Sequence, residues 1–121
     1  MKIGVVSLLV LFSFLLASGQ LLFKKVAETS DILSSFSGIL GLLTNFWFWV
    51  ALVIYGIATL LWIYILQKIA LSQAYPFVAL GFIFVPLGAR FLFQETLSFS
   101  YFIGMSFILA GLWFVTAAGN A

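Results

Sequence analysis

The chain has 121 residues, of which 65% are hydrophobic and 7% are charged, and its formal net charge is +2. A soluble domain of this length cannot bury so much apolar surface, so the composition predicts an all-α, polytopic membrane protein that lipid solvates. The sequence contains no cysteine and no histidine, which excludes disulfides and thiolate chemistry and argues against a metal site, a cofactor and an enzymatic activity. The small positive charge is too weak to indicate nucleic-acid binding.

The first predicted span covers residues 3–23, an apolar run close to the length of about 20 residues that crosses a hydrocarbon core of about 30 Å. A cleavable signal peptide competes with this interpretation, because a lysine precedes the run and the small residues 17–19 resemble a cleavage site. Processing of residues 1–18 therefore stays open. The apolar run continues to Lys24 and Lys25, which favours a retained span.

Polar and small residues form a stripe down this first span, since Ser13, Ala17, Gln20 and Lys24 are spaced as neighbours on one helical face. Such a stripe should face protein or a water-filled cavity rather than lipid. For Ser13 and Ala17, the interpretation is simple helix packing through small residues. Gln20 and Lys24 either line a cavity or, in the case of the lysine, reach the membrane interface.

Residues 25–45 are the most polar stretch and are interpreted as a loop that leads into the oblique or interfacial beginning of the second span. The second predicted span covers residues 46–66. Only residues 67–73 separate it from the third, so the second and third helices form an antiparallel hairpin. Aromatic residues at both ends of the second span are typical of the two membrane interfaces, and they are Trp47, Trp49, Trp62 and Tyr64.

The third predicted span covers residues 74–93 and contains the most informative polar positions. Tyr75, Pro86 and Arg90 fall on one arc of its helical wheel. Pro86 lies in the interior, where it must kink the helix or free a backbone carbonyl that a site can use. Arg90 lies where hydrocarbon meets water, and an ionisable residue at that depth is a functional candidate.

The fourth predicted span covers residues 100–118 and follows a tight turn over residues 94–98. Gly104 and Gly111 form a small-residue seam at heptad spacing, which suits helix–helix association. No residue of this span is ionisable.

The distribution of cations does not decide the orientation in the membrane. Lys2 and Lys68 fall on one side, and Lys24, Lys25 and Arg90 fall on the other. A difference of one charge is too small for the positive-inside rule. It permits insertion in both orientations, or pairing with a partner of opposite orientation.

Three segments of the chain carry a resemblance to a known family: residues 18–27 (SGQLLFKKVA), 60–82 (LLWIYILQKIALSQAYPFVALGF) and 91–115 (FLFQETLSFSYFIGMSFILAGLWFV). In their order and spacing the chain resembles the four-helix branch of the drug/metabolite transporter superfamily, which includes the small multidrug resistance pumps. The resemblance covers nearly all of the chain outside the first loop. It implies a four-helix membrane fold of the small multidrug resistance type.

Two branches of that superfamily compete. The multidrug pumps carry a membrane-buried glutamate three residues before the glycine that matches Gly19, and this chain has Leu16 there. Without that carboxylate no obvious proton-coupling or cation-binding group remains in the membrane, and export of drugs or small cations becomes the first alternative. The chain is more similar to the ArnE/ArnF-like subunits, at Gly19-Gln20-Leu21, Lys24 or Lys25, Gln67, Ala74-Tyr75-Pro76 and Glu95.

The second resemblance implies a flippase subunit of a bacterial inner membrane that moves undecaprenyl-phosphate-linked aminoarabinose. Arginine and lysine are natural partners of phosphate oxygens, so Arg90 together with Lys24 or Lys25 is expected to hold the phosphate. Glu95 either pairs with Arg90 or meets an amino group of the sugar. In the structural alternative, Arg90 and Glu95 are an ordinary interfacial pair. The candidate substrate-binding residues are Gln20, Lys24, Lys25, Gln67, Tyr75, Arg90, Glu95 and Tyr101.

Four helices of this length enclose little cavity, and carriers of this kind place their site between two inverted halves. We therefore expect an antiparallel dimer of identical or related chains, with Gly104 and Gly111 in the seam. The second alternative is a structural subunit of a larger membrane complex. Scattered, lipid-facing positions of Gln20, Tyr75 and Arg90 would favour it, whereas their clustering around one pocket would argue against it.

Overall fold

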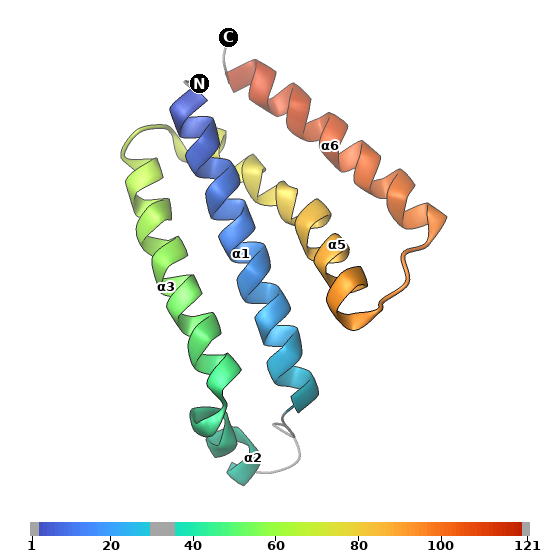
Figure 1. Ribbon diagram of the computed structural model, residues 1–121. Helices are drawn as coiled ribbons and strands as arrows, with labels where there is room; N and C mark the ends of the chain where they lie inside the picture. Colours follow the sequence, from blue (N-terminus) through green and yellow to red (C-terminus); the bar gives the residue numbers. More distant parts are fainter. Residues whose placement is uncertain (1–2, 30–35, 120–121) are drawn as a thin grey trace.

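The computed structural model describes residues 3–29 and 36–119, and in these ranges Figure 1 shows helices joined by short connections, without a strand. In this part of the chain, the helical segments long and apolar enough to cross a membrane are Ile3–Thr29, Phe46–Leu66, Leu71–Phe93 and Phe99–Ala118. The predicted all-α fold with four spans is therefore confirmed. With η marking a 3-10 helix, the elements are α1 (Ile3–Thr29), α2 (Phe36–Leu40), η2 (Gly41–Thr44), α3 (Phe46–Leu66), α4 (Leu71–Ala74), η3 (Tyr75–Leu80), α5 (Gly81–Phe93) and α6 (Phe99–Gly119).

Helix α1 is the central element, with α3 packed along one side and η3 and α5 along the other (Figure 1). Two glycines permit these close contacts. A side chain at Gly19 of α1 would collide with the ring of Tyr55 on α3, and one at Gly88 of α5 would collide with Leu21 of α1. The C-terminal end of α1 thus comes to lie beside the beginning of α3 and the end of α5 (Figure 1).

The buried core lies where α1, α3 and the beginning of the third span meet. The ring of Phe12 stacks on Trp62 of α3 with centroids 4.6 Å apart. Ser13 is buried, and its hydroxyl donates to the carbonyl of Phe77 at 2.8 Å and to that of Leu9 at 3.0 Å. A buried hydroxyl without a partner is costly, so this bond helps to join α1 to η3. The buried apolar residues of the core are Leu9, Phe12, Ala58, Ile65, Ala74 and Phe77.

Helix α3 begins and ends at the residues expected for the second span. Its beginning is set by Asn45, whose side-chain oxygen accepts from the backbone N–H groups of Trp47 at 3.0 Å and Phe48 at 3.4 Å. This is the usual way in which asparagine satisfies the free donors of a helix start. After Leu66 the chain turns through Gln67 and Lys68 towards α4.

Helix α1 is longer than the predicted span, which ended at Phe23. It continues through Lys24 and Lys25 to Thr29, because lysine, valine, alanine and glutamate are compatible with a helix and long cationic side chains can reach the interface. The expected loop is therefore shorter at its start. Its middle, residues 30–35, lies outside the described residues, and its end forms the short helices α2 and η2.

The third span is not one continuous α-helix. It runs from Leu71 to Phe93 and changes from α4 to the 3-10 helix η3, which has Pro76 in its first turn, and then to α5. Pro86 inside α5 has no N–H for the carbonyl four residues earlier. The hydroxyl of Tyr101 on α6 donates to that carbonyl, on Phe82, at 3.1 Å. The expectation that Pro86 frees a carbonyl is consistent with this bond.

Helix α6 leans away from the other helices (Figure 1). It packs mainly against η3 and α4, and none of residues 99–118 is buried. Residues 94–98 are an extended connection rather than the expected tight turn, and it starts at Gln94 with a left-handed φ of 57°. Gly104 and Gly111 have open space around the position of a Cβ, so the predicted seam is unoccupied by other helices of this chain.

Candidate functional site

Five of the six charged side chains in the described residues lie at the end of the molecule where α1 and α5 finish, and Lys68 lies at the other end. Helix α1 has 27 residues, and at about 1.5 Å per residue it is about 40 Å long, which exceeds a hydrocarbon core of about 30 Å. The helix is therefore longer than a span needs, and its last turns are its charged end. Lys24, Lys25 and Glu28 lie on these turns.

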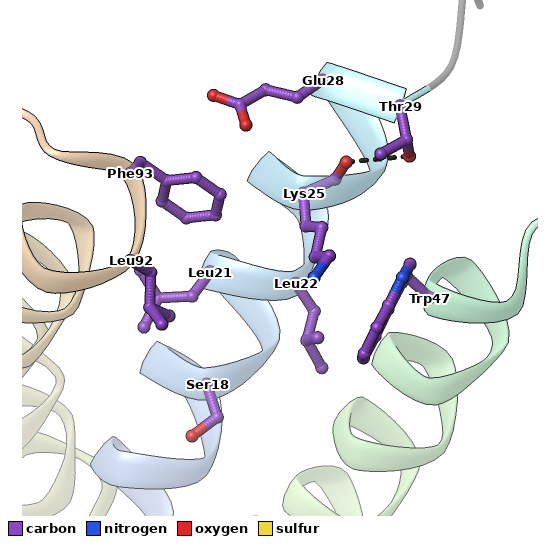
Figure 2. A pocket seen from close by; sticks show the side chains of 9 residues that line it. All are labelled: Ser18, Leu21, Leu22, Lys25, Glu28, Thr29, Trp47, Leu92 and Phe93. Atoms are coloured by element: carbon purple, nitrogen blue, oxygen red, sulfur yellow. Dashed lines mark hydrogen bonds between the residues drawn. The ribbon is translucent and has the colours of Figure 1, made fainter.

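A cavity of about 540 Å³ opens at this end, on the face of α1 between α3 and α5. Figure 2 shows Trp47 of α3 on one side of α1 and Leu92 and Phe93 of α5 on the other. Along α1 the lining changes from apolar to charged. We call this space the α1 cavity, and its lining residues are Ser18, Leu21, Leu22, Lys25, Glu28, Thr29, Trp47, Leu92 and Phe93.

Lys25 is the cation of the α1 cavity. Its Nζ lies 4.2 Å from the centroid of the Trp47 ring, as a cation–π contact. The backbone of Trp47 is itself fixed, because its N–H donates to Asn45 at the cap of α3. The lysine is thereby held toward the cavity rather than being left to extend into solvent (Figure 2).

Lys24 lies on a different side of α1 and does not line the α1 cavity. Its Nζ is 3.8 Å from Glu28 and 3.9 Å from Glu95, and each of the three side chains is about half exposed, at 46–50%. Pairs this open to solvent contribute little stability. The bond to Glu95 nevertheless places the connection between α5 and α6 beside the end of α1.

Arg90 lies near the end of α5, in a separate polar hollow of about 420 Å³ with Gln94, Glu95 and Thr96. Within the described residues Glu95 pairs with Lys24 and not with Arg90. The arginine is exposed, and no ion pair of the described part of the chain includes it. As a cation in the last turn of a helix it also interacts favourably with the helix dipole.

Gln20 and Tyr101 do not share a cavity with Lys24 or Lys25. They line a third hollow of about 420 Å³, which is mostly apolar and lies beside Pro86. The side-chain amide of Gln20 donates to the hydroxyl of Tyr55 at 2.6 Å, and the Tyr55 ring covers Gly19. The sequence analysis missed Tyr55. A tyrosine in an apolar span was the available signal, since its hydroxyl needs a partner there.

Gln67 and Tyr75 lie towards the other membrane surface, between the end of α3 and the beginning of η3. The structure therefore distributes the candidate residues over several places. Gln20, Tyr75 and Arg90 do not cluster around one pocket, so that grouping gives no argument against the structural alternative. What the structure brings together is Lys25 with two residues absent from the predicted set, Glu28 and Trp47.

Leu16, at the position where the multidrug pumps carry their glutamate, is half buried and packs against the core. Helix α1 thus places an aliphatic side chain where a proton- or cation-coupling carboxylate would be needed. This arrangement gives no support to drug or cation export.

Comparison with known proteins identifies the family. A protein of Enterobacter sp. (strain 638) is 36% identical over 107 residues, which are 87% of this chain and 90% of the relative. A protein of Pseudomonas fluorescens (strain ATCC BAA-477) is 33% identical over 105 residues, which are 84% and 92% of the two chains. Both bear the name "Probable 4-amino-4-deoxy-L-arabinose-phosphoundecaprenol flippase subunit ArnE".

A protein of Pseudomonas aeruginosa (strain UCBPP-PA14) has the same name and is 39% identical over 66 residues, 54% of this chain and 57% of the relative. No protein-family model and no solved structure matches the chain. The names place these relatives among transporters rather than enzymes. Since the first two alignments cover nearly the whole of both chains, this multi-pass membrane protein belongs to the ArnE family of flippase subunits.

Proposed function

We propose that this flippase subunit carries a polyprenyl-phosphate-linked 4-amino-4-deoxy-L-arabinose across a bacterial inner membrane. The names of its relatives support this substrate. The structural observation that supports it best is the α1 cavity, which changes from aliphatic to charged lining just where α1 leaves the hydrocarbon core.

The α1 cavity suits the part of a lipid-linked sugar where the chain meets the phosphate. Leu21, Leu22 and Leu92 provide an aliphatic wall for the first isoprene units. Lys25 lies about one turn farther along α1. A lysine is a natural partner for phosphate oxygens. The Trp47 ring holds this ammonium in place, so less side-chain entropy is lost when the phosphate binds.

A second subunit completes the carrier in this proposal. All of residues 99–118 are unburied, and α6 presents large exposed side chains such as Phe107, Trp113 and Phe114. Gly104 and Gly111 leave room for the close approach of another helix. An antiparallel dimer, of two such chains or of this chain with a related one, would cover this surface and enclose the substrate path between two inverted halves.

The test is lipid binding by native mass spectrometry, with the full chain in detergent and with undecaprenyl phosphate and its aminoarabinose derivative as probes. Lys25→Gln should raise the dissociation constants of both lipids by about tenfold, which is the scale of one charge-assisted contact to phosphate. Lys68→Gln is the matched control, because it removes a lysine that contacts Tyr64 near the opposite membrane surface. If the wild-type chain retains neither lipid, or if both lysine variants bind alike, the proposal is wrong.

A further inference from the structure

The α1 cavity contains a carboxylate that a phosphate does not need. Glu28 lines it together with Lys25, three positions earlier on the same face of α1. A cavity that received only a lipid phosphate would be better without a negative charge, because like charges repel. The pairing of one cation and one carboxylate instead suits a ligand that carries both signs.

The two charges point to different parts of the cavity. Figure 2 shows the Lys25 side chain directed towards Trp47 on α3, whereas Glu28 extends to the side of Phe93 on α5. They are not neutralised by each other, because no ion pair joins Lys25 and Glu28 among the described residues. Each therefore remains available to a different group of one ligand.

Among the described residues, the one cation within ion-pair distance of the Glu28 carboxylate is shared between two carboxylates. Lys24 lies 3.8 Å from Glu28 and 3.9 Å from Glu95, so one ammonium faces two carboxylates. The contacts are long and half exposed, and such pairs are weak. This leaves Glu28 with negative charge that a ligand cation can neutralise.

From these positions we infer that Glu28 recognises the amino group of the sugar and makes the cavity selective for an amino-sugar phosphate over a neutral-sugar phosphate. The inference rests on the proposed function and deepens it. An alkylamine is protonated near neutral pH, and an ammonium–carboxylate hydrogen bond is stronger than one between neutral groups. Lys25 would hold the phosphate, and Glu28 would distinguish the sugar.

The experiment compares two lipids that differ at one atom of the sugar: undecaprenyl phosphate linked to 4-amino-4-deoxyarabinose, and the same lipid with a hydroxyl in place of the amino group. The measured quantity is the ratio of their dissociation constants for the full chain. The wild type should favour the amino lipid by about tenfold, a discounted value for a half-exposed carboxylate. Glu28→Gln should bring the ratio close to one, and Glu28→Asp should keep part of the preference because it retains the charge.

The controls separate this inference from the proposed function. Lys25→Gln should weaken the binding of both lipids and leave the ratio of their dissociation constants unchanged, whereas Glu28→Gln should change that ratio. An unchanged ratio in Glu28→Gln overturns the inference and leaves the flippase proposal standing. Loss of selectivity in Glu95→Gln, with selectivity retained in Glu28→Gln, also overturns it, because it assigns the amino group to the other carboxylate. Failure of the wild type to bind either lipid overturns the proposed function and the inference together.

Discussion

Alanine in place of Gly19 would add one methyl group where the ring of Tyr55 already lies. A Cβ built at this position is 2.9 Å from Cδ2 and 3.1 Å from Cζ of the ring, whereas carbon atoms pack best at about 3.5–4.0 Å. The ring is held from two sides. It stacks on Phe23 with centroids 5.0 Å apart, and its hydroxyl accepts from Gln20. Retreat from the new methyl group would disturb both contacts, so we expect an overpacking cost of about 1–3 kcal/mol.

Helix propensity acts in the opposite direction, because alanine is favoured over glycine by about 1 kcal/mol inside a helix. Gly56→Ala measures this gain alone, since no atom beyond its chain neighbours and the adjacent backbone of α3 lies within 4 Å of its Cβ position. Gly88→Ala meets only the flexible end of Leu21, which can rotate away. The expected order of stability is therefore Gly56→Ala, then Gly88→Ala, then Gly19→Ala, with about 1–3 kcal/mol between the first and the last.

The free energy of unfolding in bicelles, measured by steric trapping, provides the comparison. A Tyr55→Ala background gives an internal check, because Gly19→Ala should cost nothing once the ring is absent. Equal stability of Gly19→Ala and Gly56→Ala would refute the proposed close packing of α1 on α3. A cost that persists in the Tyr55→Ala background would show that the collision lies elsewhere.

Two further substitutions test the bonds that join the third span to its neighbours. Tyr101→Phe should lower stability by about 1 kcal/mol, because it removes the hydroxyl that donates to the Phe82 carbonyl. The loss should be much smaller in a Pro86→Ala background, where the backbone N–H of Ala replaces the hydroxyl as donor. Equal losses in both backgrounds, measured by steric trapping, would contradict this. Ser13→Ala should cost about 1–2 kcal/mol, because the buried hydroxyl donates to η3. Exposed Ser7→Ala should change stability by about 0.5 kcal/mol or less, and a similar loss in both serine variants, measured by chemical unfolding, would argue against that bond.

Apolar runs were sufficient to predict the four spans, because helix length and hydrocarbon thickness are directly related. Helix α3 has the same bounds as the predicted second span, since Asn45 is a strong cap and polar residues follow Leu66. The first helix extends beyond the predicted span, because lysine continues a helix readily even where it marks the end of an apolar run.

Long-range contacts could not be predicted in the same way. The free carbonyl beside Pro86 followed from local chemistry, but its donor, Tyr101, depends on where α6 lies. The sequence identified Lys25 as a candidate and interpreted Trp47 as part of an aromatic belt. Lys25 and Trp47 are in contact because the end of α1 lies beside the beginning of α3. An apolar pattern alone does not predict which helix ends lie side by side. Glu28 was overlooked because the polar stretch after Phe23 was interpreted as a loop.

The separation of α6 from the core has a consequence for how such a protein can change over time. The buried cluster around Leu9 and Ile65, together with the partly buried residues packed on it, contains no residue of α6. Apart from Tyr101, which bonds to the Phe82 carbonyl, residues 99–118 can therefore change without altering that buried cluster. A duplicated gene could acquire a different partner by altering this one helix, while the cavity at the end of α1 keeps its shape and its charges.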